Sequence, residues 1–152
     1  QILNHLKQTL FTTLQEAKTS YESALAHSRS DDMKSEGKYD TRAIEAGYLT
    51  SAKKQRIDQL DLEYKRLQEI SDQKCDKAIL GALVTVECED KTTHYFLCCA
   101  CGGEILDIDG KKINVITTTS PLGREILGQE EGDEFELETA RGTKSYCIEQ
   151  IQ

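Results

Sequence analysis

The sequence contains no tryptophan, only one proline and no long run of apolar residues. Proline interrupts helical hydrogen bonding, so its near absence suits long, continuous helices. Crossing a bilayer takes about 18 consecutive apolar residues, and we therefore expect no membrane span. The first residues, Gln1 to Leu3, lack a basic stretch followed by an apolar one, so no signal peptide is expected.

Positive charge is also in deficit, with 19 basic against 27 acidic residues and a formal net charge of -8. Affinity for a nucleic-acid backbone requires clustered Lys and Arg, so we expect no general or sequence-specific DNA binding. The balance suits a protein that meets a basic protein surface or a bound cation. The six cysteines form neither a CxxC pair nor a secreted disulfide framework, which indicates a reducing, cytoplasmic location.

Two long amphipathic helices are predicted within residues 1–74. In the first, apolar and small residues recur at intervals of three and four, and such a stripe requires a partner helix. In the second, Ile44, Tyr48 and Ala52 begin a stripe that changes phase before Ile57, which we interpret as a stutter. Two such helices joined by a short cap predict an antiparallel coiled-coil hairpin.

The cap of this hairpin is an acidic tip at residues 28–42, which contains Asp31, Asp32, Glu36 and Asp40. One interpretation is a solvated loop whose charge only maintains solubility. The other is a set of carboxylates presented by a rigid rod to a divalent cation, since Mg²⁺ often takes one or two protein carboxylates. Composition leaves both interpretations open.

Residues 75–152 change from a helical to an alternating pattern, which is typical of strands. Asp109-Gly110 predicts a tight hairpin turn. Ser120-Pro121 predicts the start of a short helix that ends at Gly128. The predicted fold class is α+β, with the helical hairpin followed by a small, mostly antiparallel β domain that contains one short helix.

Three cysteines, Cys98, Cys99 and Cys101, are close together in the sequence and suggest a metal cluster. Neighbours on a strand point to opposite faces, so only the latter two would converge. Zinc would need two further ligands, for which Cys88 and Cys147 are the candidates. The favoured interpretation is that the cysteines act as small buried apolar residues, with zinc as the alternative.

Two further stretches stand out: residues 32–39, DMKSEGKY, and residues 116–128, ITTTSPLGREILG, followed by Glu131-Gly132-Asp133. The first is similar to a tip segment of the form D-L-K-E-N-A-E-Y, and it aligns without a gap. The second is similar to a segment of the form S-P-[IL]-[AG]-R-x-[LI]-[LI]-G with an acidic turn after it. Together they resemble the GreA/GreB family of bacterial transcript cleavage factors, and the resemblance covers nearly the whole chain.

The resemblance implies that the coiled coil inserts through the secondary channel of RNA polymerase. The β domain, of the FKBP-like kind, would then hold the polymerase surface outside. Asp32 matches the family's first essential acid and Tyr39 matches the tip aromatic. The second acid of the family falls on Ser35 here, and Glu36 or Asp31 would have to substitute for it.

The implied activity is hydrolysis of backtracked RNA by the polymerase's own two-metal site. The tip acids would help to hold the second Mg²⁺ and orient the attacking water. The protein would not be an enzyme alone, would have no cofactor of its own, would meet the nascent RNA 3′ end only indirectly and would be a monomer. The segment implied to lie at the docking surface comprises Ser120, Pro121, Leu122 and Arg124.

Three alternatives stay open. A regulator that binds the secondary channel without cleavage, in the manner of DksA, is supported by Ser35. A coiled-coil adaptor or chaperone-like module unrelated to transcription would use the same hairpin. A peptidyl-prolyl isomerase would need an aromatic pocket, which is not expected where the only phenylalanines of the β domain are Phe96 and Phe135.

Overall fold

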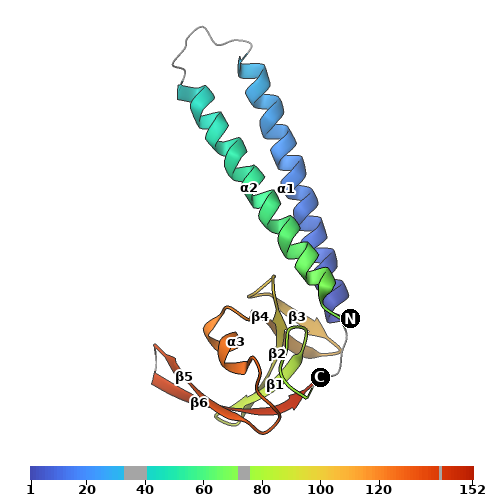
Figure 1. The fold of residues 1–152 in the computed structure, drawn as a ribbon, viewed down its shortest axis with the longest axis vertical. Coiled ribbons are helices and arrows are strands. Elements are labelled where there is room, and N and C mark those ends of the chain that lie inside the picture. The colour runs from blue at the N-terminus through green and yellow to red at the C-terminus, as the bar shows by residue number, and fades with distance from the viewer. Residues whose placement is uncertain (33–40, 72–75, 141) are drawn as a thin grey trace. The chain divides into compact units, whose positions relative to one another are not determined.

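The computed structural model describes residues 1–32, 41–71, 76–140 and 142–152, with the side chains of 28–32 and 41–43 left out. Two long helices precede a β sheet that carries one short helix, so the predicted α+β fold class is confirmed (Figure 1). No described helix is long and apolar enough to cross a membrane. The elements are α1 (Ile2–Asp32), α2 (Thr41–Glu69), β1 (Leu83–Cys88), β2 (Lys91–Cys98), β3 (Ile105–Ile108), β4 (Lys111–Thr117), α3 (Pro121–Ile126), β5 (Glu134–Thr139) and β6 (Gly142–Ile151).

The chain divides into two compact units. One is Lys7–Lys65, and the other combines Gln1–Leu6 with Arg66–Gln152. The first turn of α1 and the last turn of α2 thus belong to the unit that holds the sheet. The predicted domain boundary, between residues 74 and 75, lies outside the described residues and stays a prediction.

Within Lys7–Lys65 the two helices pack along an apolar seam. Leu10 and Leu14 of α1 are buried, as is Leu60 of α2. The rings of Phe11 and Tyr64 lie 5.9 Å apart between centroids in a tilted contact. Full burial of each such side chain contributes about 1.5–3 kcal/mol, and tertiary packing of this kind supplies most of the stability of a helix.

The predicted seam is wrong in the first half of α2. Ile44 and Tyr48 are 55% and 73% exposed, and Ala52 is exposed as well. The partly buried positions of this half form an unbroken spacing of four and three that joins the seam of the second half. These positions are Ala46, Thr50, Lys53 and Ile57, followed by Leu60 and Tyr64. No stutter is needed, because small and polar residues continue the heptad.

The strands form one sheet in the order β3-β4-β2-β1-β6-β5. All described neighbours are antiparallel except β2 and β4, which are parallel. Asp109 and Gly110 connect β3 to β4 with φ angles of 54° and 77°, so the predicted tight turn is confirmed. Such positive angles match the twist of a two-residue hairpin.

Both faces of the sheet bury apolar side chains. On one face, Val84, Leu97 and Ile148 pack with Ile126 of α3 in a single core cluster. On the other face, Phe96 is buried beside its register partner Val115. Because successive strand residues point to opposite faces, this arrangement explains the continuous apolar run in the second half of β2.

Candidate functional site

The structure places part of the acidic tip. Asp31 and Asp32 are the last two residues of α1, and α2 begins at Thr41. Two other predicted tip residues, Glu36 and Tyr39, lie outside the described residues. The structure therefore fixes where α1 ends and α2 begins, and the predicted grouping of the tip carboxylates stays a prediction.

The position of the two aspartates has an electrostatic consequence. The C-terminus of a helix carries the negative end of its dipole, so acidic residues are disfavoured there by about 0.3–1 kcal/mol each. Asp31 and Asp32 occupy this end of α1. A divalent cation bound near this helix end would offset the unfavourable interaction. This is consistent with the hypothesis that the tip carboxylates meet a cation.

A second predicted region, the start of α3, is fully described. Ser120 is the N-cap, and its Oγ accepts a hydrogen bond from the Gly123 N–H at 3.1 Å. The same hydroxyl donates to the Thr117 carbonyl oxygen at 2.7 Å. Pro121 occupies the first turn, so the predicted cap and proline are confirmed. Ser120 is consequently engaged in holding the helix start.

The other predicted docking residues divide between the two sides of α3. Leu122 is half-buried and packs against the core cluster, beside the fully buried Ile126. Pro121 and Arg124 are exposed, and Leu127 just after the helix is 45% exposed. An outward surface of one ring, one guanidinium and one aliphatic side chain can contact a partner protein without disturbing the fold.

The acidic turn after α3 is held by hydrogen bonds, a structural role that the sequence alone did not predict. The Asp133 carboxylate accepts the Glu130 N–H at 2.7 Å, and the Glu131 carboxylate accepts the Ile151 N–H at 2.8 Å. Gly132, with φ of +89°, donates its N–H to the Ile148 carbonyl oxygen at 2.7 Å. The Glu-Gly-Asp pattern was visible in the sequence, but its partners in β6 were not.

The segment that precedes the sheet pairs with the same turn. Lys77 and Glu130 pair as an isolated antiparallel bridge, and their side chains form an ion pair at 2.9 Å. The hydrogen bond that the Lys77 ammonium donates to the Glu130 carboxylate raises the pKa of Lys77. Both side chains are mostly exposed, so the ion pair contributes little to stability. The backbone bridge beneath it positions the end of α3.

The cysteines do not form a metal centre in the described residues. Cys98 is buried and Cys99 and Cys101 are half-buried. Burial raises the pKa of the Cys98 thiol to about 11, which opposes the thiolate form that metal binding requires. No group of three or more His, Cys, Asp or Glu side chains that could hold a metal ion occurs where the chain is described.

Several solved structures are similar to this chain. GreA factor homolog 1 (Gfh1) of Thermus thermophilus is 19% identical, with 96% of this chain and 94% of that chain covered and a TM-score of 0.40. Gfh1 of Thermus aquaticus is 19% identical at 95% and 92% coverage, with a TM-score of 0.44. A GreA/GreB elongation factor from Nitrosomonas europaea is 17% identical over 64% of this chain and 86% of that one, with a TM-score of 0.41.

Sequence comparison gives the family directly. Transcription elongation factor GreA of Francisella tularensis subsp. novicida is 38% identical over 77 residues, which are 49% of this chain and 44% of the relative. The protein of subsp. holarctica matches equally. The match thus spans less than half the length of these relatives. The family model described as "Transcription elongation factor, GreA/GreB, C-term" matches residues 72–152, more than half of the chain. The chain therefore belongs to the GreA/GreB family of transcription elongation factors.

Proposed function

We propose that this protein binds RNA polymerase, inserts its helical hairpin into the secondary channel and stimulates cleavage of backtracked RNA by the polymerase active site. The observation that carries the proposal is the combination of a C-terminal region matched by the family model with a long N-terminal helical hairpin. In the sequence, an acidic segment that resembles the family's tip connects the two helices. Neither part alone would support this function.

The length of the hairpin suits insertion into a channel of the polymerase. At about 1.5 Å per residue, the 31 residues of α1 extend about 45 Å. Asp31 and Asp32 are the last two residues of α1. A carboxylate delivered in this way would supply a hard oxygen ligand to the polymerase's second Mg²⁺ and orient the attacking water.

Among the tip residues, Asp32 is the first candidate for this chemistry, and Glu36 and Asp31 are the candidates for the second acid. Tyr39 would pack at the tip. The protein would act as a transcription factor and not as an enzyme by itself, since the catalytic metals belong to the polymerase. Mg²⁺ shared at the tip is therefore the only cofactor proposed, and contact with the nascent RNA 3′ end would be indirect.

The proposed docking surface on the β domain is the outward side of α3. Pro121 and Arg124 are exposed there, and the Ser120 cap holds the helix in place. Arg side chains are frequent anchors of protein interfaces because their guanidinium groups form several directed hydrogen bonds. The net charge of -8 favours a basic partner surface around the hairpin. A cytoplasmic monomer fits this role.

A transcript cleavage assay tests the proposal. Wild-type protein, Asp32→Ala and the matched control Asp58→Ala would be added to backtracked elongation complexes with Mg²⁺. Asp58 is exposed on α2, so its removal changes the net charge equally without touching the tip. We expect wild type and the control to shorten the RNA 3′ end, and Asp32→Ala to lose at least about 100-fold in rate, as losses of charge-stabilising groups typically do.

A further variant, Ser35→Glu, addresses the position of the family's second acid. If Glu36 or Asp31 already supplies that carboxylate, this variant should change the cleavage rate little. The proposal would be contradicted by wild-type protein that competes with a GreA protein for polymerase yet yields no cleavage. That result would identify a regulator that binds the channel without cleavage. If the wild-type protein neither bound polymerase nor stimulated cleavage, the chain would share the fold of the family but not the proposed function.

A further inference from the structure

A pocket of about 380 Å³ lies on the sheet face opposite α3. Its lining residues come from Gln1 and the first turn of α1, from the sheet strands and the turn between β3 and β4, and from Gly81 and Gln152. All of them belong to the unit formed by Gln1–Leu6 and Arg66–Gln152. The volume falls in the range of about 300–1,000 Å³ that is typical of small-molecule sites. Nothing in the proposed action of the tip or of α3 uses this pocket.

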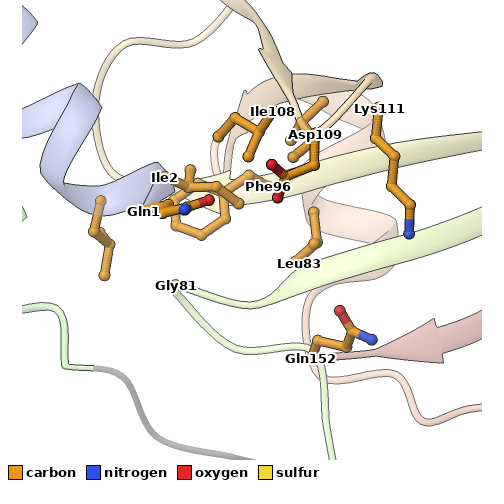
Figure 2. Close-up of a pocket in the computed structure, with 11 residues that line it drawn as sticks. Gln1, Ile2, Gly81, Leu83, Phe96, Ile108, Asp109, Lys111 and Gln152 are labelled. Carbon is orange, nitrogen blue, oxygen red and sulfur yellow. The ribbon is translucent and has the colours of Figure 1, made fainter.

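Apolar side chains form much of the pocket wall. Phe96 and Ile113 are buried, and they expose an edge to the pocket. Ile2 lies over the Phe96 ring, and Leu83 closes the opposite side (Figure 2). Aliphatic and aromatic walls of this kind suit a branched or aromatic side chain, whose burial contributes about 1.5–3 kcal/mol.

Two charged side chains of opposite sign line the pocket. Asp109 lies in the turn between β3 and β4, and Lys111 is the first residue of β4. Figure 2 shows the carboxylate extending toward Phe96 and the ammonium extending on the Leu83 side. Lys111 is the register partner of Ile108, so it projects to the same face as that pocket residue. In the described part of the chain, neither charge takes part in an ion pair.

We propose that this pocket binds a free apolar α-amino acid. The apolar side chain of the ligand would occupy the space between Phe96 and Leu83. Its ammonium would meet the Asp109 carboxylate, and its carboxylate would meet the Lys111 ammonium. Charge-assisted hydrogen bonds of this type are about twice as strong as neutral ones.

The two opposite charges discriminate this ligand from simpler ones. A fatty acid or an apolar amine would satisfy one charge and leave the other without a partner. A peptide would present at most one of the two free groups together with its apolar side chain. A polar amino acid would satisfy both charges but would leave the apolar walls in contact with water. Only the zwitterion with an apolar side chain matches the apolar walls and both charges together.

The test is a chemical-shift titration of the full chain without polymerase, so it does not depend on the proposed function. The probes are L-leucine and L-phenylalanine, with glycine, 4-methylpentanoate and L-leucinamide as analogues that lack the side chain, the ammonium and the carboxylate. The variants are Asp109→Asn, whose side chain tolerates the positive φ at this position, and Lys111→Gln. The matched controls are Asp107→Asn and Lys112→Gln, since these register partners project to the other face.

We expect saturable shifts of the Leu83, Phe96 and Ile113 amides with L-leucine or L-phenylalanine and none with glycine. Asp109→Asn should weaken L-leucine binding by roughly tenfold and leave the affinity for 4-methylpentanoate unchanged, whereas Lys111→Gln should spare L-leucinamide. The controls should bind as the wild type does. The proposal is overturned if neither amino acid saturates, if glycine binds equally, or if the controls lose as much affinity as the pocket variants.

Discussion

Gly123 occupies a position in α3 where no side chain fits. A Cβ atom built there would lie 2.1 Å from the Thr117 carbonyl oxygen and 2.9 Å from the Ser120 Oγ. Both atoms belong to the capping arrangement and cannot move without breaking it. We therefore expect Gly123→Ala to lower the free energy of unfolding of the β-sheet unit by about 2–3 kcal/mol, in the range of overpacked cores. Urea unfolding followed by the amide signals of the sheet would measure it.

The matched control is Gly47→Ala in α2. No atom lies within 4 Å of a Cβ built at Gly47, which is exposed in a helix interior. The same substitution should there stabilise the hairpin by about 0.5–1 kcal/mol, because alanine favours the helix over glycine. Equal effects at the two positions would contradict the steric explanation for Gly123.

Cys98 predicts a pH dependence of stability. Burial raises the pKa of its thiol to about 11 from an ordinary value of 9.0. Below pH 9 the thiol is protonated in both the folded and the unfolded chain. Between pH 9 and 11 only the unfolded chain loses this proton, so stability falls with rising pH. The loss attributable to Cys98 should approach about 2–3 kcal/mol by pH 11, because a tenfold difference in proton affinity between the two states corresponds to about 1.4 kcal/mol.

Cys98→Ala isolates this contribution. Tyrosine and lysine side chains also titrate in this pH range, but they do so in both proteins. The difference in unfolding free energy between wild type and Cys98→Ala should therefore shrink between pH 9 and 11. A difference that stays constant across this range would show that the Cys98 thiol titrates normally in the folded protein.

At the scale of the element, the first half of α2 is poorly supplied with apolar seam residues. Thr50 is a partly buried seam position, and its hydroxyl donates back to the Ala46 carbonyl oxygen at 3.0 Å. We expect Thr50→Leu to stabilise the hairpin by about 1 kcal/mol, since leucine buries more apolar area and favours the helix. Hydrogen exchange of the α2 amides would report the gain. Ser51→Leu, on the exposed side, should change stability by no more than about 0.5 kcal/mol.

The helices and turns were predictable because their signals are local. Asp109-Gly110 and Ser120-Pro121 specify a turn and a cap through the conformations of adjacent residues. The seam of α2 was not predictable from apolar residues alone. The large apolar side chains of that stretch are exposed, namely Ile44, Tyr48 and Leu49. The register is set by the well-packed second half of the helix, which carries Thr50 into the seam regardless of its polarity.

The features of the candidate site that the sequence did not predict depend on contacts between residues that are far apart in the chain. Glu131 accepts a hydrogen bond from Ile151, twenty positions further along the chain. The resemblance marked this acidic turn, but only the folded sheet brings the two residues together. The pocket at Asp109 and Lys111 is similar, because its walls come from strands that are separated in the sequence.

At the scale of the whole molecule, the proposed function separates attachment from chemistry. The outward side of α3 belongs to one compact unit and the tip is reached through the other. A defect in attachment should disappear when the protein is in excess, because mass action restores occupancy. A defect in chemistry should persist at any concentration. The two kinds of variant are therefore distinguishable in one assay.

Arg124→Ala and Asp32→Ala test this separation through the RNA cleavage rate measured against protein concentration. Loss of an exposed interface arginine typically costs about 1–2 kcal/mol, so Arg124→Ala should shift half-saturation roughly 5- to 30-fold and retain the maximal rate. Asp32→Ala should retain half-saturation in competition with wild type and lose the maximal rate. Lys112→Ala removes one exposed positive charge from β4 of the same unit, outside α3, and should behave as the wild type does. A reduced maximal rate for Arg124→Ala would show that docking and tip placement are coupled, and that the two units do not act independently.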